Sequence, residues 1–412
     1  RITQMALTDG PNDSDTQKYL YFSSERHGIR RATYDLTTST LVPGSLEDVA
    51  TDLNGLGIAF HGDTLYASEM YTSDNDNSVE LSRIVRIEQQ GLGTRTEIVQ
   101  GIPRQDHGVN HIQIVGDSLY VGIGVRTRNG AFQTWSGDDY GESAYGGSIG
   151  VIDDLNLVGS EQNAAGFYPA HPASNAYRDL IDGTDPLSAS PFTTTDPGKL
   201  RIHSSGTRNP FGVAVDGESR VWFTNNWQRN ENHVYDRDNL SNAEGDAFGG
   251  DGFQDDIHDQ MFLATPKGDY GYRNGNWQGG NAAGNTAAVD AGFFAPANRR
   301  ASFTFDNYVA PVAGDEQDAQ NPALNQDYSP HDPIGLGPSS SANGCAFYQG
   351  NDLPLPQHQD AFGARWNGTL TDGGDELTFR DLVGVESTTG EVRRIAAGFR
   401  NPLDCLLYTS DA

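Results

Sequence analysis

Apolar and polar positions along the chain recur as a unit of two short strands joined by a tight turn. Each copy runs apolar for four or five residues, turns through glycine with an acidic residue, and resumes with Leu or Val followed by Tyr or Trp. Strands rich in β-branched and aromatic residues around such a turn are typical of β-hairpins. The copies are GIAFHGDTLYAS from Gly57, HIQIVGDSLYVG from His111 and GVAVDGESRVWFTN from Gly212.

The spacing of these hairpins predicts a repeat-built, all-β fold. Their first residues, 57, 111 and 212, lie 54 and then 101 residues apart, and the second gap is close to twice the first. A period near 50 with one sheet per repeat is typical of a β-propeller, whose sheets pack radially around one axis. The pattern therefore predicts a single propeller domain over residues 1–412 with roughly six to eight blades.

Long polar stretches rich in Asp, Asn, Gly and Ser separate the apolar segments. The sequence predicts loops over residues 137–148, 236–259 and 315–343. Loops longer than about 15 residues in a compact domain are usually functional or mobile. In a propeller they would crowd one end of the central channel, so we expect a ligand site there.

The charge of the chain excludes two classes of partner. The 27 Lys plus Arg against 56 Asp plus Glu give a formal net charge of −29. Nucleic acids and anionic membrane surfaces require a basic face, so neither is expected as a partner. Only three of the cations are lysines, and such acidic, lysine-poor composition indicates a salty or extracellular medium. No apolar run approaches the roughly 18 residues that span a bilayer.

The ends of the chain and its cysteines add little chemistry. The chain begins at Arg1 without an apolar signal segment, so we expect a targeting segment to have been removed or left out. Cys345 and Cys405 show no metal-type spacing, and two unpaired small apolar residues are favoured over one disulfide.

Two histidines precede and open the second hairpin. In the loop before a strand, His107 would lie at the channel mouth, neutral near pH 7 and able to act as a general base. The alternative is that His107 and His111 are ordinary surface histidines. A gap of four residues makes a metal pair only on a helix, and the following IQIV alternation indicates a strand, so a zinc site is not expected.

Arginine and acidic loops offer further candidates. Arg208 and Asn209 precede the third hairpin, where the guanidinium could bind an anionic ligand or form a salt bridge with a nearby carboxylate. The Asp-rich segments from Thr72, Asp236 and Gly249 offer the hard oxygen ligands that calcium prefers, or are simply solvated surface.

Four segments, in order and at their spacing, resemble the glucose/sorbosone dehydrogenase family. The resemblance extends from about residue 50 to residue 404. The family consists of six-bladed propellers, typically periplasmic, that use pyrroloquinoline quinone (PQQ) and calcium to oxidise aldoses. The segments are QDHGVNHIQIVGDSLYVGIG, GTRNPFGVAVDGESRVWFTNN, DQMFLATPKGDYGY and SSSANGCAFYQGNDLP.

The resemblance implies roles for particular residues. His107 resembles the general base that takes the sugar hydroxyl proton, while hydride passes to the quinone and on to an external electron acceptor. Arg208 resembles the arginine that contacts the cofactor and stabilises charge on its carbonyl oxygen. The implied cofactor contacts are Arg208, Asn209, Asn226, Asp259, Arg365 and Arg400, and the implied calcium ligands are Trp227, Gln228 and Asp259.

The chain departs from the family pattern at several places. Val109-Asn110 and Gly124-Val125 stand where the family has Gly-Gly and Gly-Asp, and Gln260 stands where it has an acid. The loop between residues 228 and 259 is longer than in the sugar dehydrogenases. The tail CLLYTSDA, residues 405–412, resembles translated sequencing-adapter sequence; if it is not native, the last blade is incomplete.

Three functions therefore stay open at this point. The first is a PQQ- and calcium-dependent sugar dehydrogenase in the periplasm or outside the cell, and it predicts that His107, Arg208 and Arg400 converge. The second is a non-catalytic propeller that binds carbohydrate or protein, with those residues scattered or paired off. The third is a calcium-dependent lactonase-like hydrolase, with a ring of carboxylates and no arginine nearby.

Overall fold

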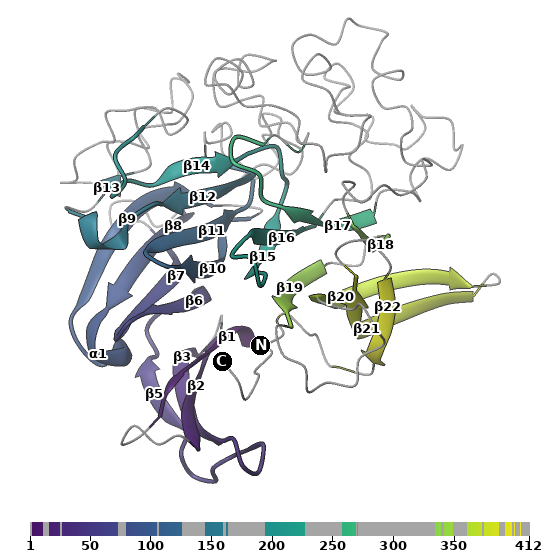
Figure 1. The fold of residues 1–412 in the computed structure, drawn as a ribbon, viewed down its shortest axis with the longest axis horizontal. Helices are drawn as coiled ribbons and strands as arrows, with labels where there is room; N and C mark the ends of the chain where they lie inside the picture. Colours follow the sequence, from purple (N-terminus) through teal and green to yellow (C-terminus); the bar gives the residue numbers. More distant parts are fainter. Residues whose placement is uncertain are drawn as a thin grey trace, which may run out of the picture.

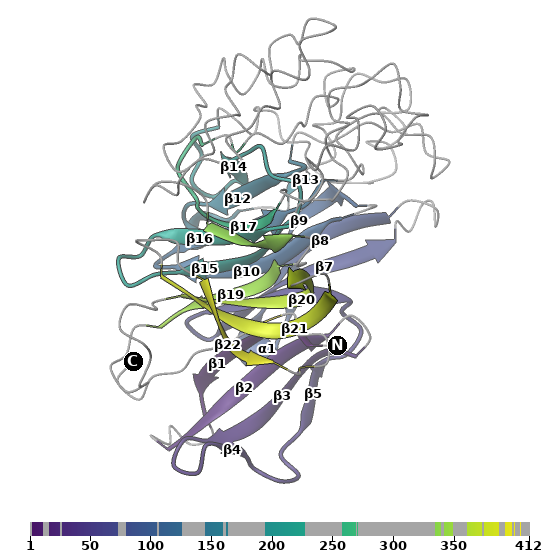
Figure 2. The same ribbon diagram turned by 90° about the vertical axis from the view of Figure 1, so that its right-hand side faces the viewer.

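The chain forms β-sheets that radiate from a common axis, which is the architecture of an all-β propeller (Figure 1). Five such sheets are formed by the residues that the computed structural model describes, and Figure 2 shows them from the side. The described residues are 2–10, 16–24, 27–72, 80–104, 107–125, 145–159, 162–163, 194–226, 258–268, 270, 334–338, 342–348, 361–372, 375–386, 392–397, 399 and 404. A sixth blade is not among the sheets of these residues, so the six-bladed count stays a prediction.

Each sheet is built from strands that follow one another along the chain. The first two sheets contain β1 (Ile2–Asp9), β2 (Gln17–Ser24), β3 (Gly28–Asp35), β4 (Thr40–Leu41) and β5 (Glu47–Ala50), and then β6 (Gly55–His61), β7 (Thr64–Thr72), β8 (Glu80–Ile87), β9 (Arg95–Pro103) and β13 (Gln162–Asn163). The other sheets contain β10 (Val109–Val115), β11 (Ser118–Ile123), β12 (Ser148–Ile152) and β14 (Arg201–Ser204); β15 (Pro210–Val215), β16 (Val221–Asn225), β17 (His258–Leu263) and β18 (Ile334–Pro338); and β19 (Ala342–Phe347), β20 (Ala361–Asp372), β21 (Asp375–Val385) and β22 (Val392–Ala397). The helical elements of the described residues are short: α1 (Glu88–Gly91) and the 3-10 turn η2 (Leu155–Leu157).

The three predicted hairpins are confirmed as β6–β7, β10–β11 and β15–β16. Gly62 and Gly116 turn the first two of them with φ of +56° and +58°, a backbone conformation that favours glycine. The strand that opens each hairpin is the innermost of its sheet. These innermost strands, together with β1 and β19, contact one another in the order β1, β6, β10, β15, β19 and so line the axis (Figure 1).

The predicted polar loops are wrong at their C-terminal ends, where the structure has strands. Strand β12 begins at Ser148, β17 begins at His258, and β18 together with the start of β19 falls within 315–343. The reason is visible in β12, whose five residues are all buried. A short strand between two others gains its burial from the neighbouring strands and needs no strong pattern of its own.

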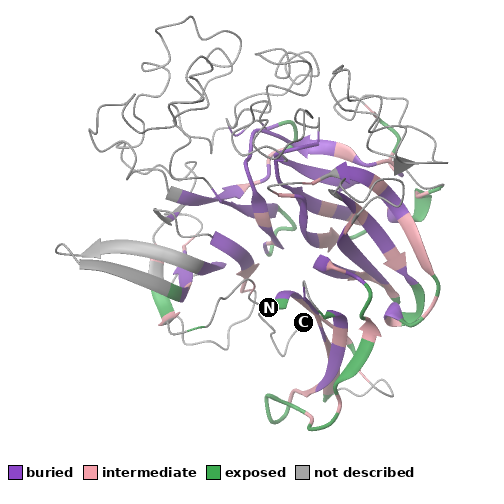
Figure 3. Cartoon of the chain, turned by 180° about the vertical axis from the view of Figure 1, so that it is seen from behind, coloured by how far each residue is buried: buried purple, intermediate pink, exposed green. Residues whose placement is uncertain are grey.

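The core consists of four apolar clusters, each of which fills the space between two consecutive sheets. Tyr66 and Leu65 are neighbours on β7, yet they belong to different clusters, as do Trp222 and Phe223 on β16. Successive side chains of a strand point to opposite faces, so a sheet between two others buries both. This explains why the hairpins read as nearly continuous apolar runs, and Figure 3 shows the burial concentrated along these strands.

All five innermost strands carry a register irregularity near their start. A bulge frees a backbone N–H from the ladder. In three sheets a hydroxyl on the second strand accepts that N–H: Ser23 from Gln4 at 3.1 Å, Ser68 from Gly57 at 2.7 Å and Thr224 from Gly212 at 2.9 Å.

The same three hydroxyls also join each sheet to the next. Ser23 Oγ donates to the carbonyl of Leu56 at 3.2 Å, Ser68 Oγ donates to that of Asn110 at 2.7 Å, and Thr224 Oγ1 donates to that of Asn343. The bulges therefore bring the starts of neighbouring inner strands into fixed contact. In the described part of the chain, no helix is long and apolar enough to cross a membrane.

Candidate functional site

The loops that precede two inner strands meet at one end of the axis. The backbone N–H of His107 donates to the carbonyl of Val125 at 3.2 Å, and the N–H of Val125 donates to the carbonyl of Arg208 at 2.8 Å. The N–H of Asn226, just after β16, donates to the carbonyl of Asn209 at 3.0 Å. These main-chain hydrogen bonds thus hold four of the predicted site residues together, although up to 119 positions separate them in the sequence.

Gly124 allows the side chains of His107 and Asn209 to approach each other. A Cβ atom at position 124 would lie 2.4 Å from the Cβ of His107 and 2.8 Å from Oδ1 of Asn209. Atoms at these distances overlap, so a larger residue would displace one of the two side chains. The site therefore requires glycine at position 124. The family pattern also has glycine here, and the chain departs from that pattern only at the next residue, Val125.

Two further asparagines fix the Arg208-Asn209 turn. Asn110 Nδ2 donates to Oδ1 of Asn209 at 2.8 Å and to the carbonyl of Pro210 at 3.2 Å. Asn225 Oδ1 accepts the backbone N–H groups of Arg208 at 3.1 Å and of Asn209 at 3.0 Å. A turn anchored on both sides presents its side chains in one orientation.

The electrostatics of the site keep His107 neutral. Burial, and secondly the positive charge of Arg208, hold the pKa of His107 well below its ordinary value. Arg208 is only 8% exposed, and its Nη1 donates to the carbonyl of Asn226 at 3.4 Å. The imidazole of His107 is thus neutral, and the charge of Arg208 disfavours its protonation.

Strand β17 carries an acid near its start, and this acid contacts β19 of the next sheet. Asp259 is 1% exposed, and its Oδ2 accepts the backbone N–H of Ala342 at 3.2 Å. Gln260 is also buried and pairs with Asn225 in the ladder. The next residue after Ala342 is Asn343, whose Oδ1 accepts from Nδ2 of Asn226 at 3.4 Å. Asp259 therefore lies next to the site, and its role toward cofactor or calcium stays a prediction.

Arg365 lies on β20 in an ion pair. Its guanidinium donates to both carboxylate oxygens of Asp381, at 2.7 and 2.5 Å, and to the carbonyl of Leu336 at 2.9 Å. Both side chains are nearly inaccessible to solvent, at 6% and 0% exposure. Arg394 adds a further contact to Asp381 at 2.9 Å. These contacts give Arg365 a structural role within its sheet; a contact with a cofactor stays a prediction.

Some of the predicted ligands lie in segments whose structure is not described. Trp227, Gln228 and Arg400 are outside the described residues, as is Cys405. Among the residues that the structure describes, no three His, Cys, Asp or Glu side chains gather as a metal site would require. Cys345 is buried and free, and burial raises the pKa of its thiol.

The interpretation of the two histidines as surface residues is wrong for His111. Its side chain is 1% exposed, and Nε2 lies 2.5 Å from the carbonyl of Thr3. Its ring also packs against Phe211, with ring centres 4.8 Å apart. Because His111 faces β1 on the axis while His107 lies in the loop with Arg208, the two do not form a pair.

Sequence reasoning included Asn209 and Asn226 in the site but missed Asn110 and Asn225, which fix the Arg208-Asn209 turn. A signal was present: an asparagine stands within two residues of the start of four inner strands. They are Asn54, Asn110, Asn209 and Asn343. Aligning the repeats on these positions would have placed the four side chains at the same end of the propeller.

Comparisons with solved structures return sugar dehydrogenases, at low similarity. An oxidoreductase (glucose dehydrogenase) from Thermus thermophilus is 15% identical, with 98% of this chain and 87% of that chain covered and a TM-score of 0.48. The soluble aldose sugar dehydrogenase of Escherichia coli in its apo-form is 12% identical, with 96% of this chain and 88% of that chain covered and a TM-score of 0.47. The PQQ-bound aldose sugar dehydrogenase of Streptomyces coelicolor is 18% identical, with 95% of this chain and 91% of that chain covered and a TM-score of 0.41. No protein-family model and no curated protein matches the chain.

Proposed function

We propose that the protein is a quinoprotein sugar dehydrogenase, which oxidises an aldose to its lactone with PQQ and calcium. The observation that carries the proposal is the pair of main-chain hydrogen bonds through Val125 that brings neutral His107 and buried Arg208 to one place. Oxidation of a sugar hydroxyl needs a group that accepts the hydroxyl proton and a cation that stabilises developing negative charge. These two side chains supply both functions at one end of the propeller axis.

The residues present fit a group that carries carboxylates. PQQ has three of them, and in a chain of net charge −29 a buried guanidinium is the kind of partner that such an anion requires. Arg208 and Asn209 would hold it, because Asn225 and Asn110 fix their turn. Trp227 and Gln228, through their carbonyls, and Asp259 would be the residues that hold calcium. Bound PQQ would supply the hydride acceptor, and calcium would supply Lewis-acid polarisation.

His107 takes the proton of the sugar hydroxyl, while the hydrogen on the same carbon leaves as hydride. A carboxylate bound beside Arg208 would offset the repulsion that a protonated His107 meets, and so would raise the pKa of His107 when the site is loaded. The two electrons would then leave to an external acceptor. The acidic, lysine-poor surface supports a periplasmic or secreted location.

The two other functions find less support. A non-catalytic propeller predicts these side chains scattered, whereas main-chain hydrogen bonds bring His107 and Arg208 together. A lactonase-like hydrolase predicts a ring of carboxylates with no arginine nearby, whereas Arg208 lies in this site. The proximity of His107 and Arg208 favours oxidation.

Reconstitution tests the proposal. The full chain is incubated with PQQ and calcium, freed of unbound cofactor, and assayed by dye reduction over a panel of aldoses. We expect retained quinone absorbance, turnover of at least one sugar, and loss of turnover but not of absorbance in His107→Ala. Arg208→Met should weaken retention of the quinone. Wild-type protein that retains no quinone and oxidises no sugar would refute the proposal.

A further inference from the structure

The sheet of β10 and β11 is joined to the sheet of β15 and β16 by a different kind of side chain from that used by three other sheets. In those three, the second-strand residue at the register irregularity carries a hydroxyl that donates to a carbonyl near the start of the next inner strand. These residues are Ser23, Ser68 and Thr224. In the sheet of β10 and β11 the residue at this place is Gly122. Because glycine has no side chain, another residue must make the connection to β15.

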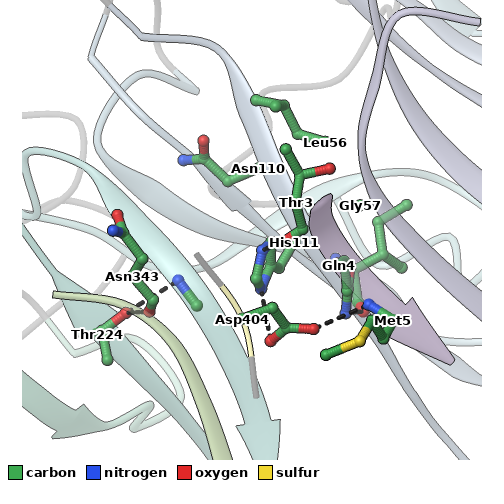
Figure 4. Close-up of polar contacts among 12 residues, drawn as sticks. Thr3, Gln4, Met5, Leu56, Gly57, Asn110, His111, Thr224, Asn343 and Asp404 are labelled. Carbon is green, nitrogen blue, oxygen red and sulfur yellow. Dashed lines mark hydrogen bonds and ion pairs between the residues drawn. The ribbon is translucent and has the colours of Figure 1, made fainter. Parts of the chain in front are cut away.

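The amide of Asn110 makes that connection. Its Nδ2 donates to the carbonyl of Pro210, the first residue of β15, at 3.2 Å, and Asn110 is only 3% exposed. Figure 4 shows the amide pointing away from Thr3 and Gly57, which lie on the two preceding inner strands. The donor therefore comes from the inner strand β10 instead of the second strand β11.

Gly122 allows the carbonyl of Pro210 to approach more closely than a side chain would permit. A Cβ atom at position 122 would lie 2.0 Å from this oxygen. In the preceding sheet, by comparison, Oγ of Ser68, one atom beyond its Cβ, lies 2.7 Å from the carbonyl that it contacts. The start of β15 is thus close against β11, and the Arg208-Asn209 turn directly precedes it.

The same amide also holds the side chain of Asn209. Asn110 Nδ2 donates to Oδ1 of Asn209 at 2.8 Å. A hydroxyl has one hydrogen to donate and an amide NH₂ group has two, so only the amide can serve both acceptors. Oδ1 of Asn209 and the Cβ of His107 both face Gly124, at 2.8 and 2.4 Å from the position of a Cβ there. The exchange of a hydroxyl for an amide thus connects the junction between two sheets to the surroundings of His107.

We propose that Asn110 is a positioning residue for the sugar oxidation and that Gly122 makes the space in which it acts. Asn110 holds Asn209 against Gly124, and so keeps the Arg208-Asn209 turn and His107 in one arrangement. The inference rests on the proposed function, because Asn110 acts on the reaction through these neighbours.

The test compares two variants that break this arrangement with one that breaks an equivalent connection elsewhere. Asn110→Leu removes both hydrogen bonds at similar volume, and Gly122→Ala adds a methyl group that would overlap the carbonyl of Pro210. Each protein is loaded with PQQ and calcium and assayed by dye reduction, and the rate is divided by the bound quinone measured from its absorbance. We expect kcat per bound quinone to fall about tenfold or more in both variants, with a smaller change in KM, because a displacement of about 1 Å near reacting groups can cost ~100-fold.

Ser23→Ala is the matched control. It removes a hydroxyl that joins the first two sheets, so it should lower the melting temperature while leaving kcat per bound quinone as in wild type. Asn110→Ser, whose hydroxyl offers one donor instead of two, replaces Asn110→Leu if thermal melting shows that the leucine variant does not fold. Wild-type kcat per bound quinone in the Asn110 and Gly122 variants would refute the positioning role and leave the dehydrogenase standing.

Hydrogen exchange of the cofactor-free protein provides a measurement that does not depend on turnover. The peptide that contains Arg208 and Asn209 should exchange faster in Asn110→Leu than in wild type, and at the wild-type rate in Ser23→Ala. If wild-type protein oxidises no sugar, the proposed function fails. Faster exchange in Asn110→Leu would then still support the positioning of the turn by Asn110, whereas unchanged exchange would refute it.

Discussion

The carboxylate of Asp404 accepts the backbone N–H of Met5 at 2.8 Å, which joins residues 399 positions apart in the sequence. Figure 4 shows this carboxylate between Met5 and His111, whose Nδ1 lies 3.9 Å from Asp404 Oδ1. Its side chain is only 6% exposed. Asp404 is thus joined to the first strand on the axis and lies close to a side chain of β10.

Asp404→Ala should destabilise the protein by about 1–3 kcal/mol, because the partly buried N–H of Met5 loses its charged acceptor. The free energy of unfolding is measured by urea titration. Asp9→Ala, on the same first strand but with a side chain 75% exposed, is the matched control and should change stability by less than about 0.5 kcal/mol. Asp404→Asn retains an acceptor oxygen and should fall between the two. Equal free energies of unfolding for Asp404→Ala and wild type would contradict a stabilising role for the hydrogen bond between Asp404 and Met5.

Stability should fall as the pH drops from about 6.5 toward 4. Burial lowers the pKa of His111 to about 4 and that of His203 to about 4, below the ordinary histidine value. The unfolded chain therefore binds protons in this window while the folded chain does not, so protonation favours unfolding. Urea midpoints measured between pH 7.5 and pH 4.5 check this.

His203→Gln should flatten that pH dependence, whereas His27→Gln, at an exposed position, should leave it unchanged. The pKa values of the Asp117 and Asp216 carboxyls are also lowered, so these two groups titrate below this pH range and do not contribute to the change in stability. A wild-type midpoint that stays constant from pH 6.5 to pH 4.5 would show that these histidines are not buried in their neutral form.

Gly124→Ala should reduce sugar oxidation by at least about tenfold, because its methyl group would overlap His107 and Asn209 and misplace the proton acceptor. Initial rates of dye reduction give the effect, and thermal melting shows whether the fold persists. Gly217→Ala is the control, since a Cβ there meets no atom within 4 Å. Full activity in Gly124→Ala would place His107 outside the reaction.

Thr224→Val should destabilise the fold by about 1–3 kcal/mol, because the N–H of Gly212 loses its acceptor and the carbonyl of Asn343 loses its donor. Valine has nearly the same shape as threonine, so packing is conserved and the effect reports the hydroxyl. Thr224→Ser keeps the hydroxyl and should recover most of the loss. Denaturant unfolding distinguishes the two variants, and equal stabilities for Val and Ser would rule out the bridging role.

The local part of the fold was predictable from the sequence, and the part that depends on distant partners was not. The hairpins starting at Gly57, His111 and Gly212 carry their own turn and their own apolar pattern, so both strands and the turn are confirmed. Strands β12, β17 and β18 were missed, because their burial comes from neighbours that the chain reaches only after long polar segments.

The candidate site was likewise predictable only where its residues stand in local motifs. His107, Arg208 and Asn209 stand in short motifs before strands, and the structure brings them together. Asn110 and Asn225 act through side-chain contacts to a turn 99 and 16 residues away, respectively, which no local pattern reveals. The pairing of Arg365 with Asp381 likewise depends on two strands and their register.

The four apolar clusters give the propeller a particular folding behaviour. Each cluster joins only two consecutive sheets, so most stabilising contacts are between neighbouring segments of the chain. A chain of units coupled to nearest neighbours can nucleate at any sheet and grow outward from it. The contact between Asp404 and Met5 differs, because it joins residues 399 positions apart and its loop can close only after the intervening sheets are in place. This contact would then form last, on a set of sheets that has already assembled.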